Sequence, residues 1–227
     1  MLGTRAVAAA DDPWVRWDWV GSHIPLIRAA LAQHIELTLI AVVVGLLVAL
    51  PLGLLAWRRR LLRGPIFSVT GILYTIPSLA LFALLVPFTG LSFLTAEIGL
   101  VSYTLLILIR NIVVGMDAVP QEVREAARGM GFRPMGQLRR IDLPLAVPAI
   151  VAGARIATVT TIGLVTVTAL IGEGGLGSLM LDGLIRDFRT PLVVGTVLSV
   201  ALAVVADLSL ASVQRLITPW ARGRRLT

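Results

Sequence analysis

Charged and polar side chains gather in one stretch of an otherwise apolar chain, between residues 120 and 144. Pro120 suits the first turn of a helix, and Glu122 and Glu125 follow it where the helix dipole favours negative charge. Small apolar residues recur there at i, i+3, i+4 and i+7, and glycines follow where such a helix would end. These residues are Val123, Ala126, Ala127 and Met130, with the glycines Gly129 and Gly131. The stretch predicts a short exposed helix, with a further helical turn after Pro134.

The residues of this helix are suited to contact with another molecular surface. Small side chains on an exposed stripe allow a close approach. The flanking Arg124, Glu125 and Arg128 can fix the register of a partner through charge-assisted hydrogen bonds. The alternative interpretation is an amphipathic helix that rests on the bilayer surface.

Arg155 is a single charge within a long apolar run, between Leu143 and Gly172. An ionisable residue at membrane depth is costly and is a functional candidate by default. Several threonines follow it and favour a bundle interior or a solute pathway; they are Thr158, Thr160, Thr161, Thr166 and Thr168. Arg155 can equally snorkel or bond to backbone carbonyls at a helix break, and the sequence leaves both interpretations open.

A second polar break, Tyr74-Thr75-Ile76-Pro77-Ser78, lies in another apolar run. Backbone groups that a proline frees inside a membrane are tolerated only against protein or a water-filled cavity. Tyr74, Thr75 and Ser78 are therefore candidates for a solute pathway. A kink that simply packs against a neighbouring helix is the equally weighted alternative.

Other patterns offer less chemistry. The run from Gly172 to Gly177 lacks a following Lys and a strand-to-helix context, so we expect a flexible turn rather than a phosphate site. His23 and His34 are the only histidines, and we expect them at a surface or interface rather than as metal or haem ligands. The chain contains no Cys, which excludes thiolate chemistry. We expect no catalytic residue, no metal and no cofactor.

The elements that position these residues are membrane spans. The 227 residues are 57% hydrophobic and 15% charged, with a mean hydropathy of +0.90, outside the range of soluble domains. At about 20 residues per crossing, the sequence predicts an all-α polytopic protein with about five transmembrane helices. The spans are expected at 37–56, at 65–86 as one kinked helix, at 98–114, at 143–172 with a bend or break, and at 192–213.

The basic residues orient these spans. All 20 are Arg, and 13 of them lie after the first span, in the 117–144 loop or after the last span. The positive-inside rule makes these segments cytoplasmic. We therefore expect the N-terminus outside and the C-terminus inside. This topology also explains the net charge of +7 without a role in nucleic-acid binding. The N-terminus lacks a signal-peptide pattern, and Trp14, Trp17 and Trp19 predict an interfacial segment on the outer surface.

The stretch EAARGMGFRPMGQLRRIDLP, Glu125 to Pro144, resembles the cytoplasmic coupling signature of ABC-importer permeases. It has Glu-Ala-Ala, three residues, Gly131, nine residues, and then Ile-Asp-Leu-Pro. The segments TIPSLAL from Thr75, IDLPLAVPAIVAGARIATV from Ile141 and ALIGEGGLG from Ala169 look like permease subunits of osmoprotectant importers, which carry glycine betaine, choline, carnitine or proline. The resemblance covers about residues 34 to 213.

This resemblance implies a type I ABC-importer permease fold and a subunit that is not itself an enzyme. It implies two cytoplasmic ATPase subunits docked on the loops, a second permease copy or paralogue, and an extracytoplasmic solute-binding protein. It assigns ATPase coupling to the motif residues, which are Glu125, Ala126, Ala127, Gly131, Ile141, Leu143 and Pro144. The expected organisation is an extracytoplasmic segment (1–33), a permease domain (34–213) containing the loop (117–144), and a basic cytoplasmic tail (214–227).

Two other classes remain as alternatives. A secondary transporter or channel would usually show internal repeats or ion-coupling carboxylates within the spans, and here Glu36, Glu97 and Asp207 are expected near span ends. A membrane scaffold or electron-carrier subunit is disfavoured because no span contains a histidine pair. The solute, the gating residues and the identity of the second permease are not readable from the sequence.

Overall fold

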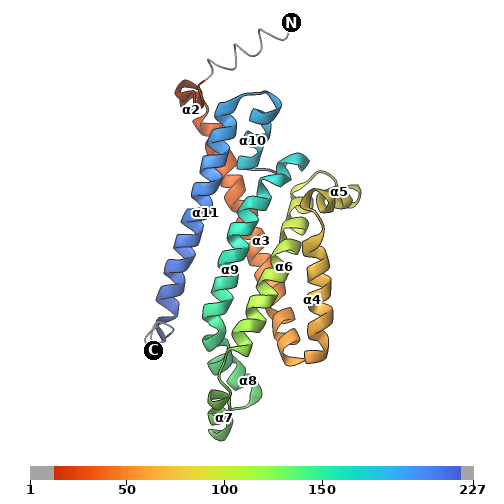
Figure 1. Cartoon of the computed structure of the whole chain (residues 1–227), viewed down its shortest axis with the longest axis vertical. Helices are drawn as coiled ribbons and strands as arrows, with labels where there is room; N and C mark the ends of the chain where they lie inside the picture. The colour runs from red at the N-terminus through yellow and green to blue at the C-terminus, as the bar shows by residue number, and fades with distance from the viewer. Residues whose placement is uncertain (1–12, 221–227) are drawn as a thin grey trace.

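The chain folds into an elongated bundle of helices (Figure 1). The computed structural model describes residues 13–220, and no strand occurs in that range. The predicted all-α class is thus confirmed. In chain order the helices are α2 (Trp17–Ser22), α3 (Ile24–Arg58), α4 (Arg60–Thr75), α5 (Ser78–Thr89), α6 (Phe93–Asp117), α7 (Gln121–Gly129), α8 (Pro134–Gln137), the π-helical turn η1 (Leu138–Asp142), α9 (Leu143–Val165), the 3₁₀ turn η2 (Val167–Ile171), α10 (Leu176–Ile185) and α11 (Arg189–Ile217).

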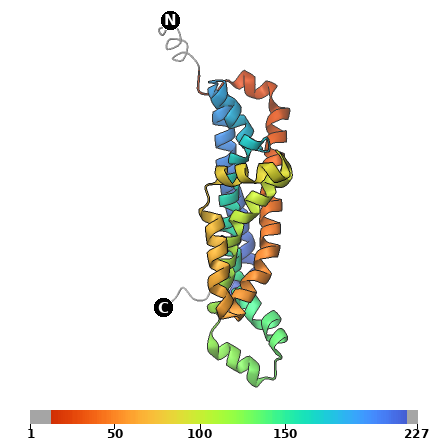
Figure 2. The same cartoon turned by 90° about the vertical axis from the view of Figure 1, so that its right-hand side faces the viewer.

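The two ends of the bundle carry different elements. α2 and α10 lie at one end, which we call the α2 end (Figure 1). α7, α8, the α3–α4 turn and the end of α11 lie at the other, which we call the coupling end (Figures 1 and 2). The arginines of residues 58–63 and 124–140 therefore share one end of the bundle, as their grouping in the sequence suggested.

The core is built by α3, α6 and α9, which approach closely at small residues. A Cβ added to Gly53 of α3 would lie 2.7 Å from the Ile112 side chain of α6, and one added to Gly115 of α6 would lie 2.9 Å from the carbonyl oxygen of Ala146 on α9. Small residues at helix contacts maximise packing where water cannot drive association. Most of the largest fully buried side chains accordingly belong to α6, including Leu108, Ile109 and Ile112.

The span predicted at 65–86 is not one kinked helix. Within residues 13–220, four helices are long and apolar enough to cross a membrane, and the pair α4 and α5 makes a fifth candidate whose two halves meet at 95°. The break follows from Pro77, which lacks an N–H and disfavours helical geometry at the residue before it. Ile76 is accordingly extended, with φ −62° and ψ 127°. α4 runs along the bundle and α5 lies across it (Figure 2).

The run from Leu143 to Gly172, predicted with a bend or break, is interrupted near its end. α9 stops at Val165, and the 3₁₀ turn η2 leads into the glycine-rich segment. The short apolar helix α10 then follows, which the sequence analysis missed because ten residues are too few to cross a membrane. α10 packs on α11, where a Cβ on Gly195 would lie 2.8 Å from the Leu176 carbonyl oxygen.

Candidate functional site

The predicted exposed helix forms at the coupling end as α7. Pro120 precedes its first residue, Glu122 lies in its first turn and Arg128 in its last, as the helix dipole favours. Gly131 closes the helix end with φ +79°, a conformation that side chains other than glycine rarely adopt. α8 begins at Pro134, so the predicted helical restart is also confirmed.

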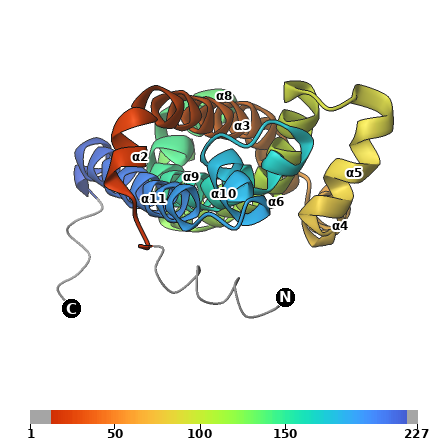
Figure 3. The same ribbon diagram turned by 90° about the horizontal axis from the view of Figure 1, so that it is seen from above.

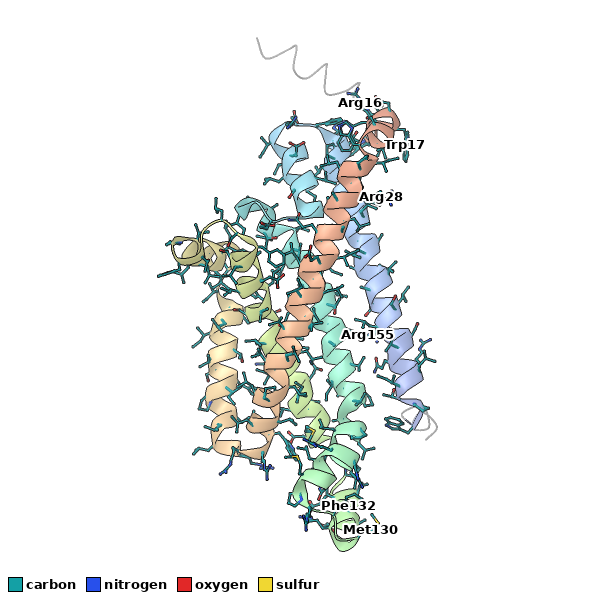
Figure 4. All side chains as sticks on the ribbon, turned by 180° about the vertical axis from the view of Figure 1, so that it is seen from behind. Arg16, Trp17, Arg28, Met130, Phe132 and Arg155 are labelled. Carbon is teal, nitrogen blue, oxygen red and sulfur yellow. The ribbon has the colours of Figure 1, made fainter. Side chains whose placement is uncertain are left out.

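The exposed apolar surface of this loop differs in part from the prediction. Val123 and Ala126 are exposed, and Met130 is 70% exposed at the tip, which Figure 4 labels beside Phe132. Ala127 is fully buried, so it does not belong to the exposed stripe. α7 packs against α8 and η1, which follow it in the chain, and the Phe132 N–H caps the end of α7 by donating to the Ala127 carbonyl oxygen at 3.1 Å.

Arg124 makes its contacts within this chain rather than with an external partner. Its Nε donates to a carboxylate oxygen of the buried Asp142 at 3.0 Å, and its guanidinium also donates to the Met116 carbonyl oxygen. The same guanidinium lies 5.1 Å from the Trp57 ring centroid. Arg124 thus joins α7 to the end of α6, to η1 and to α3, which sequence spacing could not reveal. The prediction that it sets the register of a partner is corrected.

Glu125 remains available on the outer surface of α7. Its side chain is 57% exposed and accepts a hydrogen bond from Gln121 at 2.8 Å, with Arg128 at 4.0 Å. Three further motif residues, Ile141, Leu143 and Pro144, are half-buried where η1 passes into α9. The motif therefore has an exposed half on α7 and a half that attaches the loop to a membrane span.

The polar break around Tyr74 is satisfied within the protein. The Tyr103 hydroxyl of α6 donates to the carbonyl oxygen of Ile76, at the extended residue between α4 and α5. The Tyr74 ring meets the Tyr103 ring edge-on at 5.9 Å, and the Thr75 hydroxyl donates to the Ile72 carbonyl oxygen at 2.8 Å. Tyr103 is a residue that the sequence analysis missed, since nothing in its local sequence distinguishes it from any other span tyrosine.

Arg155 lies halfway along α9 and is paired with side chains of α11. Its Nε and Nη2 each donate to Asp207 at 2.9 Å, and its Nη1 donates to Gln214 at 3.3 Å. Gln214 in turn donates to the Pro148 carbonyl oxygen at 3.0 Å. α11 continues ten residues beyond Asp207, so this carboxylate lies within the helix rather than at its end. The hydrogen bonds of Arg155 thus go to side chains of α11 rather than to backbone carbonyls.

The four pathway candidates do not come together. Tyr74, Thr75 and Ser78 lie at the α4–α5 break, on one side of the bundle, and Arg155 faces α11 on the other (Figures 1, 3 and 4). Beside Arg155 and Asp207 is an open cavity of about 490 Å³ between α9 and α11, lined also by Ile156 and Thr160. Nothing in the order of residues along the chain relates the two polar breaks in space.

The glycine-rich turn is held firmly, and His34 is the reason. His34 is fully buried, with Nδ1 accepting from the Leu176 N–H at 3.3 Å and Nε2 donating to the Ile162 carbonyl oxygen at 3.1 Å. Gln33 adds a hydrogen bond to the Glu173 carboxylate at 2.7 Å. A Cβ on Gly175 would lie 2.8 Å from His34. His34 therefore lies at an interface between α3, α9 and α10 and not at the outer surface, and the glycine-rich turn is hydrogen-bonded to α3.

Glu97 is a second buried ionisable residue that the sequence analysis placed near a span end. It lies one turn inside α6 and is 7% exposed, and neither carboxylate oxygen has a hydrogen-bond partner among the described residues. No group of His, Asp and Glu suited to a metal ion occurs within residues 13–220.

A bundle with four or five crossings and a helical loop projecting from one end is the architecture of a transport-protein membrane subunit. Residues 20–219 match the family described as the binding-protein-dependent transport system inner membrane component, and the chain belongs to this family. The family places the chain in the inner membrane as a multi-pass component of an ABC importer. The chain is the permease, with ATP hydrolysis in a separate subunit and a solute-binding protein as a further component. The secondary-transporter and electron-carrier alternatives are thereby set aside.

Curated relatives and solved structures agree with this assignment. The choline transport system permease protein OpuBB of Bacillus subtilis is 38% identical, with 82% of this chain and 86% of the relative covered. The osmoprotectant import permease protein OsmW of Salmonella typhimurium is 36% identical, with 82% and 89% covered. The fold resembles that of the methionine ABC transporter MetNI in an inward-facing conformation, with a TM-score of 0.77 and 22% identity over 87% of this chain and 98% of that chain.

Proposed function

We propose that this permease imports osmoprotectants, in particular quaternary amines such as choline, glycine betaine and carnitine. The observation that carries the proposal is that several relatives are named for the same class of solutes. Besides OpuBB and OsmW, the glycine betaine/carnitine/choline permease OpuCB of Bacillus subtilis is 35% identical, with 82% of this chain covered. By their names, these three relatives carry solutes of one class.

In the assembled importer, two ATPase subunits dock on the coupling ends of two permeases, either two copies of this chain or this chain and a paralogue. The exposed Glu125, Ala126 and Met130 of α7 support this role, because they present an apolar stripe with a charge at its side. Gly131 shapes the tip of the loop. Ala127 supports α7 from inside, while Ile141, Leu143 and Pro144 carry its displacement into α9.

The solute passes beside the α4–α5 break. Tyr74, Thr75 and Ser78 support this assignment because they offer hydroxyl groups where the helix is interrupted, and Tyr74 is 38% exposed. Arg155 contributes by holding α11 against α9, since its donors are already directed to Asp207 and Gln214.

The coupling end faces the cytoplasm and the α2 end faces outward, where the solute-binding protein docks. The arginines of residues 58–63 and 124–140 support this orientation through the positive-inside rule. The segment 1–33 is then extracytoplasmic, 34–213 forms the permease domain, and 214–227 is a cytoplasmic tail. Residues 1–12 and 221–227 lie outside the described part of the chain.

The test is uptake by a bacterial strain that lacks its own osmoprotectant importers and expresses this chain with its ATPase, partner permease and solute-binding protein. We expect ATP-dependent accumulation of radiolabelled choline or glycine betaine, and growth rescue by these solutes at high osmolarity. Methionine, the solute of the structurally similar MetNI transporter, is the matched negative control. Accumulation of methionine without that of any quaternary amine would overturn the proposed solute class while leaving the permease assignment intact.

A further inference from the structure

An apolar groove lies at the α2 end, between α2, the first turns of α3 and the start of α11. It encloses about 320 Å³, and nine of its ten lining residues are apolar, among them Trp17, Ile24, Ile27 and Val197. Arg28 is the tenth. Figure 4 shows Arg28 nearer the middle of the bundle than Trp17, on the same side of this end. The groove thus combines an apolar floor with a single cation.

The groove lies at the edge of the membrane. Its α11 wall, residues 193–198, belongs to the uncharged run from Thr190 to Ala206, which must lie in hydrocarbon. Trp14 and Trp17 stand beside it, 70% and 76% exposed, and tryptophan favours the level of the headgroups. An occupant of this groove would therefore have its apolar part in hydrocarbon and its polar part at the headgroup level.

Arg28 supplies a free cation beside this wall, and its long side chain can carry the guanidinium outward towards the headgroups. It is exposed and has no ion pair or hydrogen bond with any described residue. Two other arginines at this end form ion pairs: Arg16 lies 3.7 Å from Asp18, and Arg186 lies 2.6 Å from Asp182. A guanidinium is well suited to two hydrogen bonds with a phosphate, so the charge of Arg28 complements a phospholipid headgroup.

We propose that the groove binds one anionic phospholipid of the leaflet at the α2 end, with an acyl chain against Val197 and Leu198 and its phosphate on Arg28. The bound lipid fixes α2 and α3 to α11 at the end of the bundle that is farthest from the ATPase. This site is independent of which solute the importer carries.

The experiment uses the intact importer in lipid nanodiscs whose lipids carry brominated acyl chains, which quench a tryptophan in contact with them. The Trp17 signal is obtained by subtracting the fluorescence of a Trp17→Phe variant. We expect brominated phosphatidylglycerol, at a low fraction in phosphatidylcholine, to quench Trp17 several-fold more than the same fraction of brominated phosphatidylcholine. Equal quenching by the two lipids would overturn the proposal, because it reports only bulk membrane contact.

Two variants separate the parts of the site. Arg28→Gln should abolish the preference for phosphatidylglycerol, whereas Arg186→Gln, at the same end but outside the groove, should keep it. Val197→Trp should fill the groove and reduce the lipid retained in detergent, counted by mass spectrometry, whereas Val205→Trp, equally exposed on α11, should not. If Arg28→Gln and Arg186→Gln act alike, only diffuse charge is involved. If Val197→Trp weakens capture of the solute-binding protein and leaves retained lipid unchanged, the groove is a protein-docking site. Either result would overturn the lipid site.

Discussion

At the scale of single residues, Glu125 is the charge best placed to meet an ATPase. Glu125→Ala should lower solute-stimulated ATP hydrolysis and uptake about tenfold or more. The change removes the carboxylate and leaves its hydrogen-bond partner on the ATPase subunit unpaired, at a cost of about 2 kcal/mol. The loop lies outside the spans, so insertion and folding should be unchanged. The measurement is ATPase and uptake rate in reconstituted complexes of normal subunit ratio.

The control is Glu122→Ala, one turn earlier on the same helix and also exposed. It should keep most of the activity, because Glu122 lies before the apolar stripe. If Glu125→Ala transports at the wild-type rate, the coupling role of α7 is wrong and the helix serves only as a surface element.

Gly131 tests the shape of the loop rather than its charge. A Cβ at Gly131 would meet nothing within 4 Å, so its φ of +79° is the reason for glycine. Gly131→Val should therefore strain the tip by about 1–2 kcal/mol and uncouple transport, and Gly131→Asn should do less harm. Gly129→Ala is the matched control, since Gly129 has equal space and does not have a positive φ. Comparable losses in Gly129→Ala and Gly131→Val would contradict this explanation.

His34 has the same kind of role at the α2 end. His34→Ala removes two hydrogen bonds from buried backbone groups and leaves a cavity, so it should lower the free energy of unfolding by about 2–4 kcal/mol. His23→Ala should cost less, because His23 is only half-buried and stacks on Trp19. Thermal unfolding in detergent measures both variants. Equal melting temperatures for the two would show that the glycine-rich turn does not depend on His34.

At the scale of elements, α11 depends on a polar contact with α9. Arg155→Gln and Asp207→Asn should each lower the melting temperature of the bundle, but by less than the loss of a fully buried pair would, because both side chains are about a third exposed. The joint change Arg155→Leu with Asp207→Leu should be less harmful than either alone, because it leaves no unpaired charge. A double-mutant cycle by thermal unfolding measures this coupling.

The same double variant shows whether Arg155 holds α11 against α9 or lines the solute path. If it folds and transports, Arg155 is structural, as its hydrogen bonds suggest. If it folds as stably as the wild type but loses uptake of zwitterionic solutes, Arg155 meets the solute and its assignment to α11 is wrong.

At the scale of the whole molecule, the absence of Cys makes the orientation directly measurable. Single cysteines at Arg58 and Arg222 should be protected in intact cells, and one at Trp14 should react with an impermeant thiol reagent, because the arginine-rich segments stay in the cytoplasm. Permeabilised cells, in which all three should react, are the control. Labelling at position 222 from outside would reverse the proposed topology.

The sequence by itself determined the class of structure and the motif. Apolar runs long enough to cross a membrane leave few alternatives to a helical bundle, and the spacing from Glu125 to Pro144 marked the loop before its shape was known. Local rules also placed the start of α7 next to Pro120 and its end at Gly129 to Gly131, because proline restricts the backbone and glycine permits a positive φ regardless of the surroundings.

Only the tertiary structure decided which polar residues meet. Arg124 with Asp142, His34 with Leu176 and Arg155 with Asp207 are separated by 18, 142 and 52 positions in the chain. No periodicity within one helix encodes such a pairing, because it depends on how two helices are rotated against each other. The 95° break between α4 and α5 is similar: Pro77 marks its place, while its angle is set by what α4 and α5 pack against.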